Sequence, residues 1–172
     1  MGSKRRNRVG FLVALTFGLS LFVSCSTMHY IKVNHNHTER LLNSFYQKNG
    51  NAFYLSSTYS NFSTVWTYEE DRAVVYRLQN GRIRQKLSFN GIEPFQFGSL
   101  IPENLEKELY QDCPMVLDGD MFGFIIDIDH IRHKDDYPVD ISCMKRGNYD
   151  SVVIMRLVND IKSYHLWEVE YL

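Results

Sequence analysis

The chain contains one strong signal for a β-hairpin, at Asn80-Gly81. Residues 73–78 and 83–89 on either side alternate between apolar and polar side chains. Asn-Gly between two such runs predicts a type I′ turn, because both central positions of that turn need φ > 0. The apolar side chains expected on one face are Val74, Tyr76, Leu78, Ile83, Leu87 and Phe89, and the polar ones expected on the other are Arg77, Arg84, Lys86 and Ser88. The sequence therefore predicts an antiparallel pair with one buried face and one wet, basic face.

Similar alternation elsewhere predicts further strands, and helical spacing predicts two helices. The strands expected before this hairpin are residues 52–59 and 63–69, and the later hairpins are 115–117 with 121–128 and 151–158 with 162–172. Residues 129–150 are polar and rich in turn formers, so we expect them to be irregular. The predicted helices are residues 39–48, with Thr38 as N-cap, and residues 102–110. The predicted fold class is α+β, mostly an antiparallel β-sheet of hairpins with two short covering helices.

The first 24 residues differ in composition from the rest of the chain. They contain four basic residues and no acid, and residues 9–24 form an apolar run. A spanning helix needs about 20 apolar residues, so this run is short for one. A basic start followed by a short apolar run is typical of an export signal. Without these residues the near-neutral net charge of −1 becomes −5, from 15 basic and 20 acidic side chains.

The end of this segment, Val23-Ser24-Cys25, resembles the lipobox of bacterial lipoproteins, where a small residue precedes a cysteine that is acylated. The resemblance covers residues 1–25 and implies that Cys25 carries the lipid, palmitate included, and becomes the mature N-terminus. It implies a membrane-anchored protein of the cell envelope. Because Ser26 rather than Asp follows, the sorting rule of Gram-negative lipoproteins favours the outer membrane. A plain cleaved signal and an uncleaved anchor helix are the alternatives.

The predicted organisation has three parts. Residues 1–24 are the signal peptide, residues 25–37 the lipidated cysteine and tether, and residues 38–172 a single globular α+β domain. Residues 26–37 show no periodic pattern, which favours a tether. A mature chain of this size buries about two thirds of its unfolded surface, enough for a core of its own.

Two further cysteines, Cys113 and Cys143, remain after lipidation of Cys25. A pair of thiols in an exported protein can form a disulfide. Neither cysteine lies in a C-x-x-C motif, so a thioredoxin-like redox role has no support. A structural disulfide and two buried thiols are the favoured interpretations; a nucleophilic cysteine paired with a histidine is the third, and no local signature favours it.

The densest polar cluster includes Asp127, Asp129, His130 and His133. On a strand, Asp127 and Asp129 share one face. Carboxylates and imidazoles that converge in this way can hold a divalent ion, so a metal-dependent hydrolase is the alternative function. A solvated strand end with its loop is the competing interpretation, because Asp is also a common turn residue.

Aromatic residues crowd two successive predicted strands, with Tyr54 on the first and Trp66 and Tyr68 on the second. Such faces suit protein or glycan contact, because the tyrosine ring is apolar and its hydroxyl polar. Aromatic residues are also common in strands for packing alone. The sequence predicts an exported, lipid-anchored accessory or binding lipoprotein that contacts protein, glycan or lipid through an aromatic-bearing sheet face.

Other function classes have little support in the sequence. The chain lacks the motifs of serine hydrolases, phosphate-binding loops and dinucleotide-binding folds. We therefore expect no cofactor and favour a protein that is not an enzyme. The acidic balance after residue 24 argues against nucleic acid as a partner. The expected partners are the membrane, through the acylated N-terminus, and a protein or glycan.

Overall fold

The computed structural model describes residues 32–57, 61–94, 102–113, 115–116 and 119–166. Six antiparallel strands form one sheet in the order β4-β3-β2-β1-β5-β6. The strands are β1 (Asn51–Ser56), β2 (Phe62–Tyr68), β3 (Arg72–Gln79), β4 (Arg82–Asn90), β5 (Asp120–Ile128) and β6 (Ile131–Val139). The predicted α+β class with a mostly antiparallel sheet is confirmed.

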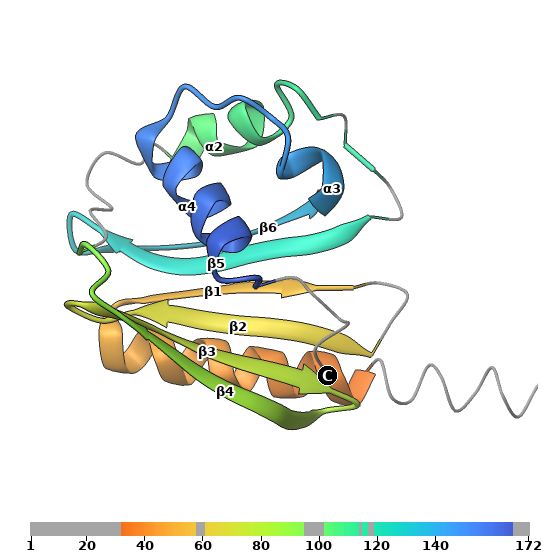
Figure 1. Cartoon of the computed structure of the whole chain (residues 1–172), viewed down its shortest axis with the longest axis vertical. Coiled ribbons are helices and arrows are strands. Elements are labelled where there is room, and N and C mark those ends of the chain that lie inside the picture. The colour runs from red at the N-terminus through yellow and green to blue at the C-terminus, as the bar shows by residue number, and fades with distance from the viewer. Residues whose placement is uncertain (1–31, 58–60, 95–101, 114, 117–118, 167–172) are drawn as a thin grey trace, which may run out of the picture.

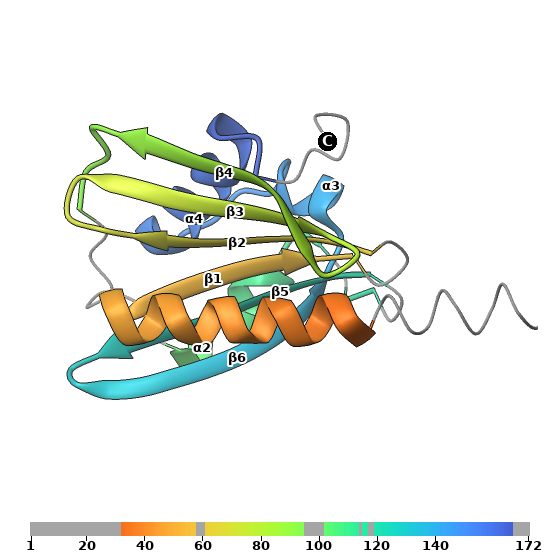
Figure 2. The ribbon, with the colours of Figure 1, turned by 90° about the horizontal axis from the view of Figure 1, so that it is seen from below.

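Helices cover both faces of this sheet (Figures 1 and 2). One face carries a long helix, residues 32–49. The other face carries α2 (Pro102–Leu109), α3 (Ile141–Met144) and α4 (Val152–Ser163). We call these the long-helix face and the α4 face. The central strands β1 and β2 are buried almost throughout, because they lie between two layers of helix.

The predicted β3–β4 hairpin is confirmed, with φ of 52° at Asn80 and 70° at Gly81. The predicted division of its side chains is wrong. A register shift between Arg77 and Leu78 places Leu87 opposite Val75, on the α4 face, instead of beside Leu78. A bulge of this kind reverses which face the following residues occupy.

Arg77, predicted on the wet face, is 2% exposed. Its guanidinium donates to Gln85 Oε1 at 3.1 Å and to the carbonyl oxygen of His165. The buried charge is therefore hydrogen-bonded both to the neighbouring strand and to the segment after α4, as burial of such a group requires.

The α4 face holds the larger apolar core. Phe53, Trp66, Phe122 and Phe124 lie at its centre, and each is at most 2% exposed. The rings of Phe53 and Trp66 stack with centroids 5.6 Å apart. The helices add apolar side chains from above: Leu105 and Leu109 from α2, Ile141 and Met144 from α3, and Ile154, Leu157 and Ile161 from α4.

A disulfide between Cys113 and Cys143 strengthens the same layer. It links Cys113, in the segment after α2, with Cys143 in α3, and the two cysteines are 30 residues apart in sequence. The structural-disulfide interpretation of these two cysteines is confirmed.

The long helix combines a small apolar contact with buried polar bonds. Leu42 and Phe45 pack on the sheet. The hydroxyls of Thr38 and Ser63 lie 2.6 Å apart, and Asn34 Nδ2 donates to Ser63 Oγ at 3.1 Å. Asn34 Oδ1 also accepts the backbone N–H of Gly81 at 3.0 Å, so the helix is tied to the β3–β4 turn.

These contacts correct two predictions. Residues 32–37, predicted as part of the tether, are helical, and Thr38 lies inside the helix rather than at its N-cap. The Thr38 hydroxyl donates to the carbonyl oxygen of Asn34, one turn earlier, at 2.9 Å. The buried side of this first part is polar, with Asn34 and Thr38, so it shows no apolar period.

The C-terminal third departs most from prediction. β5 pairs with β6 through Asp129-His130, both at positive φ, whereas residues 129–150 were expected to be irregular. Residues 115–116 form no strand, and residue 117 lies outside the described part. The helix α4 lies where the third hairpin, residues 151–158 with 162–172, was predicted. Residues 167–172, the end of the second predicted strand of that hairpin, lie outside the described part.

The reason for α4 lies in its spacing. Ser151 Oγ caps the helix by accepting the Ile154 N–H at 3.4 Å. The buried apolar residues of α4 are Val153, Ile154, Leu157, Val158 and Ile161, which is helical spacing. Valine and isoleucine favour strands by composition, but burial of one helical face outweighs that preference.

The outermost strands of the described sheet, β4 and β6, carry many charged side chains. β6 also contains Pro138, whose carbonyl oxygen accepts the Tyr110 hydroxyl at 2.9 Å. Proline suits an edge strand because it has no N–H for a further ladder.

Candidate functional site

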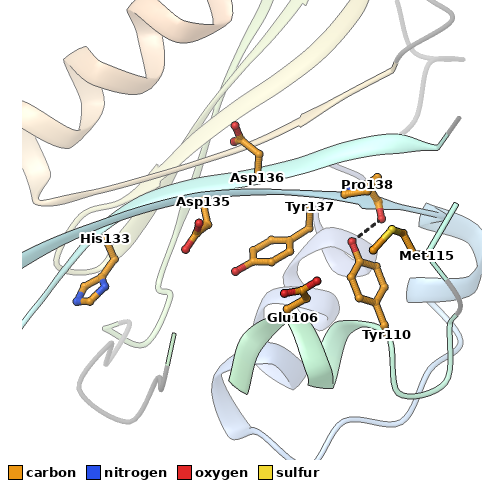
Figure 3. Close-up of a pocket in the computed structure, with 8 residues that line it drawn as sticks. All are labelled: Glu106, Tyr110, Met115, His133, Asp135, Asp136, Tyr137 and Pro138. Atoms are coloured by element: carbon orange, nitrogen blue, oxygen red, sulfur yellow. Dashed lines mark hydrogen bonds between the residues drawn. The ribbon is translucent and has the colours of Figure 1, made fainter. Parts of the chain in front are cut away.

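A cavity of about 460 Å³ lies between α2 and β6 on the α4 face (Figure 3). We call it the acidic pocket. Its lining residues are Glu106, Tyr110, Met115, His133, Asp135, Asp136, Tyr137 and Pro138. Its size falls within the range of about 300–1,000 Å³ that is common for ligand pockets.

The alternation of β6 places the pocket residues. Figure 3 shows His133, Asp135 and Tyr137 on the side of the strand that faces α2, two residues apart in sequence. Asp136 projects from the opposite side and accepts the Tyr54 hydroxyl at 2.8 Å. Tyr54 of β1, which reaches past β5, therefore holds Asp136, while Asp135 faces the cavity.

The helix α2 supplies the opposite wall. Glu106 lies in α2 and Tyr110 four residues later, so both point toward β6 (Figure 3). The hydrogen bond from Tyr110 to Pro138 fixes the end of α2 against the strand. Leu105 and Leu109, on the adjacent side of α2, anchor the helix in the core. The wall is therefore attached both to β6 and to the core where it meets the pocket.

The two tyrosine hydroxyls stay protonated at neutral pH. Burial raises the pKa of Tyr137, and the negative charges of Asp135 and Glu106 raise it further. Burial, followed by the charge of Glu106, also raises the pKa of Tyr110. The pocket thus combines carboxylates that accept hydrogen bonds with neutral phenols, of which Tyr110 already donates its hydroxyl proton to Pro138. Such a lining suits a cationic or hydroxyl-bearing group.

The predicted metal cluster is not assembled. Asp127 lies on the long-helix face and accepts the Tyr46 hydroxyl at 2.7 Å, whereas His133 faces α2. Asp129 and His130 form the β5–β6 turn at φ of 51° and 66°. Within the described residues, no three His, Cys, Asp or Glu side chains lie together in a group that could hold an ion. The strand ends one residue before Asp129, so the expected shared face with Asp127 does not exist.

The predicted aromatic binding face is also wrong for the residues named. Trp66, Tyr68 and Tyr54 are 0%, 4% and 3% exposed. Tyr68 donates to Asp160 Oδ2 of α4 at 2.8 Å, and Tyr54 donates to Asp136. Both faces of the central strands are covered, so these rings and hydroxyls serve the interior.

Of the residues that line the acidic pocket, only His133 was predicted as a site residue, and it was predicted as a metal ligand. Recognition of β6 would have shown His133, Asp135 and Tyr137 at alternate positions on one face. The helical spacing of Glu106 and Tyr110 was visible within the predicted second helix. What was missing was the contact of this helix with β6, which neither local pattern contains.

A second hollow, of about 400 Å³, lies on the long-helix face beside β3 and β4. We call it the basic groove. Its apolar lining is Leu41, Phe45, Val74 and Tyr76. Its charged lining is Lys48, Glu69, Arg72 and Lys86. It exists because a single helix covers this face and leaves part of β3 and β4 beside it (Figure 2).

Comparison of the chain with family models, curated proteins and solved structures found no match. None of the helices in the described ranges combines the length and apolar character that a membrane span requires. Cys25 and the signal segment lie outside the described residues.

Proposed function

We propose that the protein is an exported, lipid-anchored binding lipoprotein whose acidic pocket receives a basic side chain of a protein partner. Cys25 is the site of acylation, and the folded domain acts close to the membrane of the cell envelope. The membrane anchor concentrates the domain there, because two or more acyl chains hold a protein stably. The domain binds its partner without transforming it.

The observation that carries this proposal is the composition of the acidic pocket. Glu106 and Asp135 supply negative charge, and Tyr110 and Tyr137 supply rings and hydroxyl groups in the same cavity. A lysine or arginine side chain is attracted by the carboxylates and by the face of an aromatic ring. The pocket is open at the edge of β6, where a partner surface can approach.

The anchor is tested by replacing Cys25 with alanine in the full chain. We expect the wild-type protein in the membrane fraction, with a mass increased by the acyl groups. The Cys25→Ala variant should lose that added mass and its acyl anchor. A variant with unchanged mass and membrane association would contradict the lipoprotein assignment.

The pocket is tested with an octalysine peptide and the full chain in a neutral detergent. Glu106→Gln should weaken binding about tenfold, which corresponds to about 1.4 kcal/mol. Glu70→Gln, which removes an exposed acid far from the pocket, is the matched control and should change binding less than twofold.

Equal weakening in both variants would show a general charge effect and overturn the assignment of the pocket. Binding of a neutral oligosaccharide that Glu106→Gln weakens to the same degree would point to a glycan partner instead. Octaserine should not bind, because it offers no cation.

A further inference from the structure

The basic groove lies on the opposite face from the acidic pocket and has an apolar floor. The Phe45 and Tyr76 rings stack with centroids 5.1 Å apart and planes 17° from parallel. Val74 and Leu41, both half-buried, extend this surface along β3 and the helix. Because the long helix does not cover this part of β3 and β4 (Figure 2), these side chains line the groove.

Cations surround this floor. Lys48 and Arg72 keep 67% and 46% of their side chains exposed while both bind Glu69, which is 16% exposed. Lys86 places its Nζ 5.1 Å from the centre of the Tyr76 ring. Three cations and one carboxylate therefore line the groove, and the groove is positive although the chain after residue 24 has a net charge of −5.

The shared use of Glu69 leaves capacity for an anionic ligand. The hydrogen bond from Lys48 lowers the pKa of Glu69, and Arg72 lowers it further, so its carboxylate is ionised at neutral pH. One carboxylate does not neutralise three cations. A second anion in the groove would reduce this excess of positive charge, and it would gain a partly enclosed environment in which ion pairs are less screened.

We propose that the basic groove binds a free amphiphilic anion, such as a medium-chain carboxylate, with its headgroup at Lys86 and its apolar chain on Tyr76, Phe45 and Val74. Lys48 and Arg72 add positive charge to the same groove. Both halves of the ligand then meet matching chemistry. The volume of about 400 Å³ suits a small ligand rather than a folded partner. The site is separate from the acidic pocket, so the two proposals fail independently.

The test uses the full chain in nanodiscs of uncharged phosphatidylcholine and decanoate bearing a photoreactive diazirine. Saturable cross-linking should map by mass spectrometry to peptides of the long helix and of β3. Decanol with the same diazirine is the neutral probe, and it should label these peptides at least tenfold less.

Two variants separate the groove from general charge. Lys86→Gln should raise the half-saturating decanoate concentration at least fivefold. Lys162→Gln, which removes an exposed cation from α4 on the other face, should leave it unchanged. Thermal unfolding should match the wild type in both variants, because both side chains are exposed.

Equal effects of the two variants, equal labelling by decanol, or labelling confined to other peptides would each overturn the proposal. Displacement of decanoate by octaglutamate at a lower concentration than by unlabelled decanoate would assign the groove to an acidic peptide. Loss of labelling when phosphatidylglycerol enters the nanodisc would assign it to a lipid headgroup in the bilayer. Either result would overturn the free amphiphile.

Discussion

The two faces of the sheet are closed by different means. On the α4 face, 23 buried apolar residues of the described structure form one cluster; they come from the sheet, the three helices and the segments that hold Ile92 and Leu166. On the long-helix face, the corresponding cluster has seven, and buried polar bonds at Asn34, Thr38 and Ser63 supplement it. Side-chain bonds at the rim add to these, including Tyr46 to Asp127.

This difference bears on where the hollows lie. In the described part of the α4 face, the acidic pocket lies at the margin of a thick core supported by three helices, where α2 meets β6 (Figure 3). A single helix held largely by polar bonds covers less of its face, and the basic groove lies alongside it. The α4 face is therefore closed mainly by apolar packing, whereas the long helix leaves part of its face of the sheet uncovered.

The largest expected effect compares one leucine from each face. Leu157→Ala, in α4, should lower the free energy of unfolding by about 4–5 kcal/mol, because its packed surroundings cannot collapse into the cavity. Leu42→Ala, in the long helix, should cost about 2–3 kcal/mol, because one helix can shift toward the sheet. Urea unfolding measures both. Equal costs, or a larger cost for Leu42→Ala, would show that the faces resist cavities alike.

The disulfide should stabilise the α4 face by the next largest amount. Opening a link across 30 residues should cost about 3–4 kcal/mol in the chain-entropy description. Cys113→Ser can be compared with the wild type by denaturant unfolding, with and without a reductant. The reductant should destabilise the wild type and leave Cys113→Ser unchanged; a loss below 1 kcal/mol in the wild type would show that packing alone holds this layer.

The polar attachment of the long helix is tested by Asn34→Ala. The variant leaves the Gly81 N–H without its acceptor and removes the bond to Ser63, so it should cost about 1–3 kcal/mol. Amide exchange at Gly81 should also accelerate. Asn36→Ala, an exposed neighbour in the same helix, is the control and should cost less than about 0.5 kcal/mol. Similar values for both would show that the buried polar bonds add nothing.

The smallest expected effect is a pH dependence on the α4 face. Burial raises the pKa of Asp160, and the hydrogen bond from Tyr68 and the charge of Arg156 offset this only in part. The folded state therefore binds this proton more tightly than the unfolded chain does. Its contribution to stability is greatest at low pH and falls as pH rises from the ordinary carboxyl pKa through the raised folded value.

Asp160→Asn removes this titration and retains an acceptor for Tyr68. The stability of the wild type relative to this variant should therefore decrease as pH rises through that window. Thermal unfolding at a series of pH values measures the difference. If the wild type instead became more stable relative to Asp160→Asn as pH rises, Arg156 and Tyr68 would stabilise the charged carboxylate more than burial destabilises it.

Prediction from sequence succeeded where local patterns decide the structure. Alternation and Asn80-Gly81 identified β1 to β4, and the spacing of Leu105 and Leu109 identified α2. It failed where distant contacts decide. Arg77 is buried because the segment after α4 supplies an acceptor, and residues 32–37 are helical with Asn34 bound to Ser63 and Gly81.

The sites follow the same division. Both hollows are formed by segments far apart in sequence: α2 with β6, and the long helix with β3 and β4. The predicted aromatic side chains failed as a surface because a strand pattern does not show whether helices cover one face or both. The sequence shows the polar cluster of Asp127, Asp129, His130 and His133, but only the pairing of β5 with β6 shows which of these side chains share a face.

The charges on β4 and β6 also affect how neighbouring molecules meet. An exposed outer strand can template intermolecular pairing, and repeated pairing leads to aggregation. Arg82, Arg84 and Lys86 in β4 would face like charges if two copies joined edge to edge through this strand. In β6, Pro138 lacks the N–H that an added strand would need. Copies of this protein can therefore be present at high local concentration without their sheets pairing edge to edge through β4 or β6.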